Sequence, residues 1–122
     1  MHVQNILKVK GTAVATIGPD DSLADATAAL RDHGVGALVV SRDGRTIDGI
    51  VSERDVVRAL AAHGGSTLGR NVASAMSTTV TTCHGHDTVD HMMGMMTERR
   101  IRHLPVVDDD GELAGIISIG DV

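Results

Sequence analysis

The hydrophobic positions in the first part of the chain predict a short strand followed by a helix. Residues 13–17 are small or β-branched and run into Gly18-Pro19, a combination typical of a strand that ends in a turn. Ser22 is a favourable N-cap, and the apolar residues after it recur at helical spacing as far as Leu30. Gly34 fits the C-cap position, so a helix is predicted between Ser22 and Gly34.

A hairpin and a second helix are predicted next. Two apolar runs, 37–41 and 47–51, flank the turn-forming residues 42–45, as in two antiparallel strands joined by a short loop. The following sequence, ERDVVRALAAH, has helical spacing from Glu53 and ends before Gly64-Gly65. The predicted order is therefore strand, helix, hairpin, helix.

The second half of the chain has the same order of elements. Thr88 is the predicted N-cap of a helix whose apolar side consists of Val89 and the methionines that follow it. The remaining predicted elements are a strand at 104–107, a turn at 108–111 and a strand at 113–118. Residues 63–71, rich in glycine and small polar residues, are the predicted connector between the two halves.

The two halves are a sequence repeat. The segment GIVSERDV at 49–56 returns as GIISIGDV at 115–122, 66 residues later. The same offset pairs Thr12 with Thr78, Val14 with Val80, Ser22 with Thr88, Leu38 with Leu104 and Asp43 with Asp109. Residues 1–65 and 66–122 are therefore predicted to be two copies of one unit. Because a unit of about 60 residues is marginal alone, we expect the copies to share a core about a pseudo-twofold axis as one folding unit.

Composition narrows the range of functions. The chain has 122 residues, 42% of them hydrophobic and 22% charged, as in ordinary soluble globular proteins. It contains no Phe, Tyr or Trp, which excludes aromatic stacking platforms for single-stranded nucleic acid and aromatic cages for quaternary ammonium groups. The net charge of −5 argues against non-specific nucleic-acid binding, although residues 99–103 form a local basic run.

Hydropathy, the N-terminal residues and the cysteine content predict a cytoplasmic protein. No apolar run approaches the ~20 residues that span a bilayer, and the first ten residues, MHVQNILKVK, lack the features of a signal peptide. The only cysteine, Cys83, fits a reducing compartment. We therefore expect no membrane association.

Three segments resemble the tandem module named after cystathionine β-synthase, the CBS-domain pair. They are residues 49–55, 115–121 and 100–107, and the similarity extends from Ile6 to Val122. The resemblance to stand-alone bacterial pairs implies an α+β fold of tandem βαββα repeats with two clefts between the repeats. It also implies a flat homodimer and a regulatory, non-catalytic role as an energy sensor. Its expected ligands are AMP, ADP, ATP, NAD(H) or S-adenosylmethionine, with no cofactor required and the regulated protein unknown.

The residues themselves support a nucleotide site at the end of the first copy's hairpin. Ser52 lies at a strand-to-helix junction, where free backbone N–H groups and the helix dipole favour a phosphate. Arg54 can add a charge-assisted bond to that phosphate, and Asp55 can accept from a ribose diol. Helix capping alone is the alternative, because Ser22-Leu23-Ala24-Asp25 has the same Ser-x-x-Asp pattern where the family has no site.

The second site is expected to differ from the first. Gly120 stands where the first copy has Arg54, so Arg100 or Arg102 is expected to reach the phosphate, or else to be a solvated helix end. Without aromatic rings, adenine must lie in an aliphatic slot. The predicted binding residues are Thr12, Val14, Gly36, Ala37, Ser52, Arg54, Asp55, Thr78, Val80, Arg102, His103, Pro105, Ser118 and Asp121.

Other interpretations are weaker. Cys83-His84-Gly85-His86 contains zinc-ligand residue types, but the spacing is poor and a surface turn is expected, with no metal. The methionines at 92, 93, 95 and 96 are expected to provide adaptable packing in the core or at an interface, with a helical dimer face as the preferred interpretation. No nucleophile elbow or P-loop indicates catalysis. A structural or dimerisation module with unoccupied sites is the main alternative function. Because the chain ends at Val122, where a copy of the helix 53–63 should begin, we expect the final helix to be truncated here.

Overall fold

The computed structural model describes all residues from Met1 to Val122 and divides into two compact units. The central unit consists of Ala15–Val80. The terminal unit combines Met1–Val14 with Thr81–Val122, so the two ends of the chain fold together. None of the helices is both long and apolar enough to cross a membrane. The boundaries of these compact units differ from those of the predicted copies, 1–65 and 66–122. The segment before the first strand of each copy folds with the other copy, so residues 1–14 belong to the terminal unit and residues 66–80 to the central unit.

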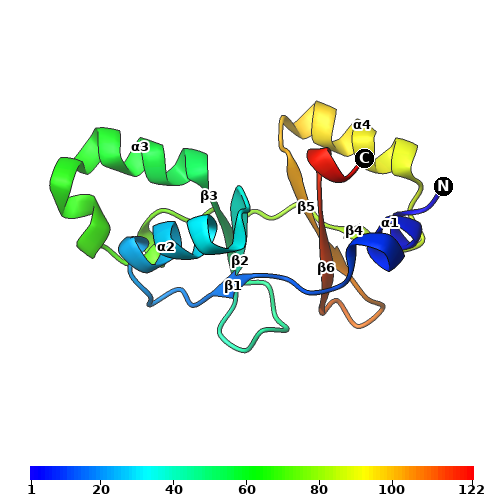
Figure 1. Cartoon of the computed structure of the whole chain (residues 1–122), viewed down its shortest axis with the longest axis horizontal. Coiled ribbons are helices and arrows are strands. Elements are labelled where there is room, and N and C mark those ends of the chain that lie inside the picture. Colours follow the sequence, from blue (N-terminus) through cyan, green and yellow to red (C-terminus); the bar gives the residue numbers. More distant parts are fainter. The chain divides into compact units, whose positions relative to one another are not determined.

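The central unit has the predicted order of elements (Figure 1). These are β1 (Thr16–Ile17), α2 (Leu23–His33), β2 (Ala37–Val40), β3 (Gly49–Ser52) and α3 (Glu53–His63), followed by 3-10 turns at Gly64–Gly69 and Val72–Ser74. The sheet has the order β1-β2-β3, with β1 parallel to β2 and β2 antiparallel to β3. The first strand is shorter than the predicted 13–17.

The terminal unit repeats this arrangement as far as its last strand, has a 3-10 turn where α3 begins in the central unit, and starts with a helix of its own. Its elements are α1 (Val3–Lys10), β4 (Cys83–His84), α4 (Val89–Arg99), β5 (His103–Val107), β6 (Leu113–Ser118) and a 3-10 turn at Ile119–Asp121. The strands form a second three-stranded sheet in the order β4-β5-β6, with the same parallel and antiparallel pairings as the first. Two similar sheets and four helices confirm the predicted α+β class.

Helix boundaries follow from the caps in the sequence. The Ser22 hydroxyl accepts a hydrogen bond from the Asp25 backbone N–H at 3.0 Å, and Thr88 caps α4 in the same way. Gly34 ends α2 in the left-handed conformation at φ 64°, which costs a glycine little. Arg100 adopts the same conformation after α4 at φ 55°, so a side chain is tolerated where the first copy has glycine.

Each unit has its own hydrophobic core. The core of the central unit contains Leu23 and Ala26 of α2, Leu38 of β2 and Val51 of β3, all fully buried. The core of the terminal unit contains Leu104, Ile117, Met92, Met96 and Cys83, together with apolar residues of α1. The prediction that the methionines form a dimer face is wrong for Met92 and Met96, because both are buried inside this core.

Helix α1 was not predicted from the sequence. It buries Val3 and Leu7 against the terminal unit, and the Val3 N–H donates to the carbonyl of Asp87 at 2.9 Å. Gly115 of β6 lies directly under this helix, since a Cβ placed there would be 2.8 Å from Cδ2 of Leu7. The helix therefore covers part of the second sheet.

Candidate functional site

In the central unit, Ser52 and Asp55 hold each other at the start of α3. Oδ2 of Asp55 accepts hydrogen bonds from the Ser52 N–H at 2.9 Å and from its hydroxyl at 3.0 Å. The Asp55 N–H donates back to the Ser52 hydroxyl at 3.3 Å. Ser22 and Asp25 lack the return bond from N-cap N–H to carboxylate, so this reciprocal pair distinguishes the predicted site from the ordinary cap of α2.

Strand pairing brings other predicted residues to this junction. Ala37 pairs with Ser52 across β2 and β3, and the carbonyl of Gly36 accepts from the Glu53 N–H at 3.0 Å. Ala37 is buried, whereas Gly36 is partly exposed. Arg54 is exposed and takes part in no ion pair or side-chain hydrogen bond.

The predicted residues Thr78 and Val80 also belong to the central unit, although the repeat assigns them to the second copy. Ser77 and Ile50 exchange backbone hydrogen bonds of 3.0 and 2.9 Å, which tie this segment to β3. Thr78 is exposed and Val80 is half-buried. The 66-residue offset shows which positions of the two copies correspond. It does not indicate that residues 66–80 fold with the first copy.

The terminal unit carries an equivalent junction. Oδ2 of Asp121 accepts from the Ser118 N–H at 2.7 Å and from its hydroxyl at 3.0 Å. His103 pairs with Ser118 across β5 and β6, and the carbonyl of Arg102 accepts from the Ile119 N–H at 2.9 Å. Arg102 is exposed, and Pro105 is buried opposite Ile116. Thr12 and Val14 follow α1 in the same unit, and neither is hydrogen-bonded to Ser118 or Asp121.

Lys10 is a site residue that sequence reasoning missed. Its ammonium lies 2.5 Å from Oδ2 of Asp121, and both side chains are partly exposed, at 27% and 24%. Partial burial works to raise the pKa of Asp121, but the hydrogen bonds from Lys10 and Ser118 and the charge of Lys10 hold that pKa below its ordinary value. The sequence indicated only that the second copy has Gly120 where the first has the cation Arg54. It did not indicate that Lys10 would supply a cation there.

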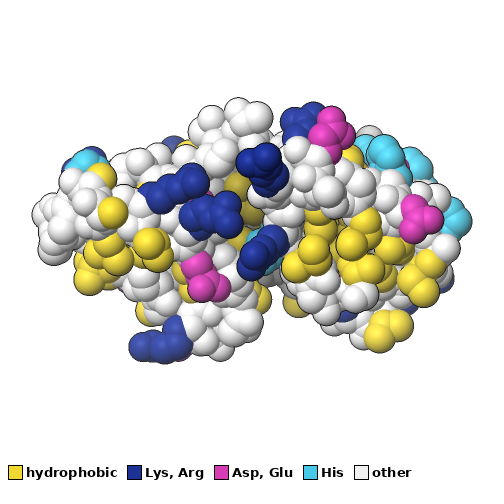
Figure 2. All heavy atoms as spheres, turned by 90° about the horizontal axis from the view of Figure 1, so that it is seen from above, with side chains coloured by type: hydrophobic (Ala, Val, Ile, Leu, Met, Phe, Trp, Pro, Cys, Tyr) yellow, Lys and Arg dark blue, Asp and Glu magenta, His cyan; other side chains and the backbone are white.

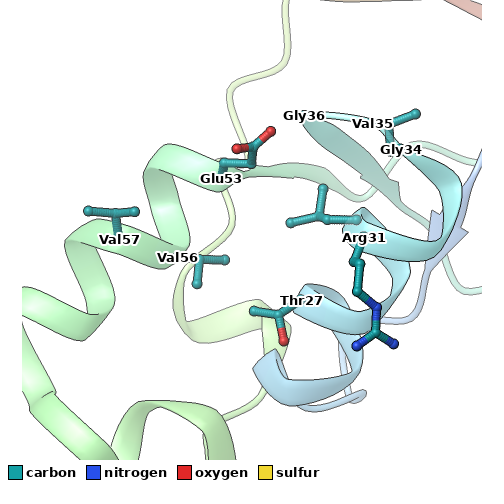
Figure 3. A pocket seen from close by; sticks show the side chains of 9 residues that line it. Thr27, Arg31, Gly34, Val35, Gly36, Glu53, Val56 and Val57 are labelled. Carbon is teal, nitrogen blue, oxygen red and sulfur yellow. The ribbon is translucent and has the colours of Figure 1, made fainter.

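Hollows on the surface of the central unit include two beside α3. The larger, about 510 Å³, is a groove between α2 and α3 into which Val56 points (Figure 3). The smaller, about 230 Å³, lies between α3 and the 3-10 turns and is lined by Asp55. The second hollow therefore shares the predicted ribose-binding carboxylate.

The Cys83 segment lies apart from these junctions. Cys83 is in β4 and buried in the core, and the turn expected at His84 and His86 is present at Gly85 and His86, while His84 is the last residue of β4. Burial, with a smaller effect from Asp87, raises the pKa of its thiol to about 11. The rings of His84 and His86 stack with centroids 5.1 Å apart. A protonated, buried thiol is a poor metal ligand.

Comparison with known sequences agrees with the repeat. A family model described as the CBS domain matches residues 8–62 and again 72–122. The CBS domain-containing protein CBSX3, mitochondrial, of Arabidopsis thaliana is 34% identical over 128 residues, which cover 98% of this chain. The chain spans 62% of the length of that protein.

Solved structures share the fold. The CBS-domain containing protein ATU1752 from Agrobacterium tumefaciens is 45% identical with a TM-score of 0.93, and the match covers 98% of this chain and 89% of that one. Protein PAE2072 from Pyrobaculum aerophilum, solved with AMP, is 26% identical with a TM-score of 0.88, covering 99% and 89%. The domain pair of protein MJ0100, solved with 5-methylthioadenosine and S-adenosyl-L-methionine, is 27% identical with a TM-score of 0.87, covering 99% and 91%.

Proposed function

The chain belongs to the CBS-domain family, and from this premise we propose that it is a regulatory module that binds an adenosine-containing ligand and responds to its concentration. The proposal rests on one observation, the carboxylate of Asp55. Ser52 holds Oδ2 of that carboxylate, and no protein group hydrogen-bonds to Oδ1. A fixed carboxylate with a free oxygen is a suitable acceptor for a ribose hydroxyl.

The surroundings of Asp55 suit the rest of a nucleotide. In the first turn of α3 the Glu53 and Asp55 N–H groups already donate to Gly36 and Ser52, which leaves the Arg54 N–H and the positive end of the helix dipole to favour a phosphate. Arg54 has no protein partner and can pair with that phosphate. Adenine would lie against aliphatic groups and backbone, since the chain has no aromatic ring to stack on it. AMP, ATP and NAD(H) are the proposed ligands.

Related proteins support this ligand class. PAE2072 was solved with AMP, and the MJ0100 pair was solved with two adenosine compounds that carry no phosphate. The proposed role is one of binding, in which the Ser52–Asp55 helix cap holds the acceptor in place. A regulatory response requires a ligand that binds two states of the protein unequally. The cytoplasmic location stays a prediction.

Calorimetry and thermal unfolding with millimolar AMP, ADP, ATP, NAD(H) and S-adenosylmethionine test the proposal. A ligand present at 100 times its Kd stabilises the folded protein by about 2.7 kcal/mol. Asp55→Ala should abolish most of that stabilisation, whereas Asp25→Ala, in the same Ser-x-x-Asp pattern at α2, should retain it. If no compound stabilises the wild-type protein, the alternative of a structural module with unoccupied sites is correct.

A homodimer is part of the proposal and is favoured by exposed apolar side chains near the groove of Figure 3. Val57 and Leu60 on α3 and Val35 after α2 are 62%, 40% and 37% exposed. A second copy of the chain would bury them. Light scattering on a sizing column should show a dimer that Val57→Glu dissociates, and a monomeric wild-type protein would exclude it.

A further inference from the structure

The outer edges of the two sheets are paired to different extents. In the central unit, Ile50 of the edge strand β3 and Ser77 exchange backbone hydrogen bonds of 3.0 and 2.9 Å. At the repeat offset of 66 residues, the counterparts of Ile50 and Ser77 are Ile116 of β6 and Gly11. No backbone hydrogen bond joins Gly11 to Ile116. The edge of β6 is therefore open at the position where the edge of β3 is paired.

The backbone of Ile116 is unpaired at this open edge. The Ile119 N–H donates to the carbonyl of Arg102 beside β5, and the direction of these groups alternates along an antiparallel strand. The N–H and carbonyl of Ile116 therefore point away from β5, and neither takes part in a hydrogen bond. An unpaired donor and acceptor on an edge strand are a template for another extended backbone.

Gly11, the counterpart of Ser77, is engaged by the end of α1 instead. Its N–H donates to the carbonyl of Leu7 at 2.7 Å. Its backbone has φ 100° and ψ 166°, a region that essentially only glycine adopts. Because the single N–H proton of Gly11 can bond fully to only one acceptor, Gly11 either caps α1 or pairs with Ile116.

The ion pair between Lys10 and Asp121 favours the arrangement in which α1 is capped. It joins the last turn of α1 to the residues that follow β6, with Nζ and Oδ2 2.5 Å apart. It is also the only ion pair in the terminal unit. On the face of that unit seen at the right of Figure 2, few Lys or Arg side chains appear among the apolar and histidine side chains. Release of Lys10 would therefore leave Asp121 without a paired cation.

We propose that residues 10–12 form a strap with two positions, one in which Gly11 caps α1 and one in which Gly11 pairs with Ile116. In the second position the strap closes the edge of β6 as Ser77 closes the edge of β3. A ligand that hydrogen-bonds to the Asp121 carboxylate weakens its attraction for Lys10, and so favours the closed strap. This ligand step rests on the proposed function and supplies the two states that a regulatory response requires. Residues 12–14 connect the strap to the central unit, so its position is passed along the chain.

Hydrogen exchange of two equivalent amides, followed by NMR, tests the strap. The Ile50 N–H is bonded to Ser77 and the Ile116 N–H is free, so Ile116 should exchange at least tenfold faster in the ligand-free protein. Ile50 is the internal control, because its partner belongs to the central unit. An Ile116 amide that is as protected as that of Ile50 would show that the edge is already closed, which overturns the proposal.

Gly11→Ser should close the strap without any ligand. It introduces the residue that pairs with Ile50 in the central unit, and it disfavours the backbone conformation that caps α1. We expect about tenfold greater protection of the Ile116 amide. Gly44→Ser, at φ 80° between β2 and β3, is the matched control and should leave that amide unchanged. Unchanged exchange in Gly11→Ser would contradict the strap.

Lys10→Met tests the role of the ion pair in the same assay. Because the pair is partly exposed, its loss should protect the Ile116 amide only a few fold. Lys8→Met removes a charge from the same turn of α1 without breaking an ion pair, and should leave the exchange unchanged. Equal exchange in the two variants would mean that the ion pair does not hold the strap, and this part of the proposal would be wrong.

A ligand arm separates this inference from the proposed function. Calorimetry shows which of AMP, ATP and S-adenosylmethionine binds, and a saturating amount of that compound should protect the Ile116 amide several fold and leave Ile50 unchanged. If a compound binds and the exchange of Ile116 stays the same, the ligand step is wrong while the binding function remains. If no compound binds but Gly11→Ser protects Ile116, the proposed function fails and the strap itself is supported.

Discussion

The two units build the same helix cap from the same repeated residues, but they leave its carboxylate in different states. Asp55 in the central unit and Asp121 in the terminal unit are both held through Oδ2 by the preceding serine. Only Asp121 also accepts from a lysine, which α1 supplies. The corresponding segment of the second copy, 69–76, contains the short 3-10 turn Val72–Ser74 instead of this helix. The repeated cap residues therefore fix the local geometry, while the segment in which the two copies differ sets the charge.

This difference makes the two carboxylates unequal as ligand acceptors. An ammonium next to Asp121 neutralises its charge and occupies Oδ2 together with two serine donors. Oδ1 of Asp121 accepts no hydrogen bond, as in Asp55, but the ammonium reduces the negative charge of the Asp121 carboxylate and so makes it a weaker acceptor for a ribose hydroxyl. We expect the central unit to carry the tighter of the two proposed sites.

The largest predicted effect concerns two equivalent glycines. A Cβ on Gly49 would lie 2.8 Å from the backbone carbonyl oxygen of Ser77, whereas one on Gly115 would meet the flexible end of Leu7 at the same distance. Backbone moves less easily than a leucine terminus. Gly49→Ala should lower the free energy of unfolding by about 2–3 kcal/mol and Gly115→Ala by about 1 kcal/mol, as for overpacked sites.

Urea denaturation of the two variants measures this difference. Gly94→Ala in α4 is the control, because nothing lies within 4 Å of the added Cβ and alanine favours a helix. Gly94→Ala should stabilise the protein slightly. Equal losses at Gly49 and Gly115 would show that α1 packs on β6 as rigidly as the backbone of Ser77 packs on β3.

A smaller effect is expected from Lys10→Met, which removes the charge difference between the caps. Because the ion pair is partly exposed, its loss should change stability by less than about 1 kcal/mol. The same substitution frees Asp121, so adenosine affinity at the terminal unit should rise a few fold. Calorimetry should show the change, and Lys8→Met on the same helix, where the lysine has no ion pair, is the matched control.

The opposite result in that experiment would be equally informative. If Lys10→Met weakens nucleotide binding, the lysine contacts ligand phosphate and replaces the cation that the repeat lost at Gly120. In that case the two sites would resemble each other, because each unit would present a cation for the ligand phosphate beside its carboxylate.

The sequence predicted the parts of the fold that depend on local signals. Ser22, Ser52 and Thr88 cap their helices as expected, and β6 has the predicted bounds 113–118. Helix α1 lacks such signals, because its N-cap is a histidine and its apolar residues gain from helix formation only when they are buried on the second sheet.

The candidate site was predictable to a similar extent. Asp55 and Asp121 were found through the repeat, and the structure brings Gly36 and Ala37 to the first of them. Lys10 and Asp121 are 111 residues apart, and no periodicity connects residues at such a separation. Arg58 and Arg70 look like ordinary surface cations until the structure places them in one pocket with Asp55.

The smallest predicted effect is a pH dependence at the terminal cap. The pKa of Asp121 is lowered in the folded protein, so its contacts with Lys10 and Ser118 stabilise the protein fully above the unfolded value of about 3.9. That contribution is lost as the pH falls through the lowered folded value. Carboxyl NMR titration should therefore give a midpoint for Asp121 that rises in Lys10→Met and does not change in Lys8→Met. An unchanged midpoint in Lys10→Met would mean that the serine bonds alone hold the carboxylate, and the two caps would then be electrostatically equivalent.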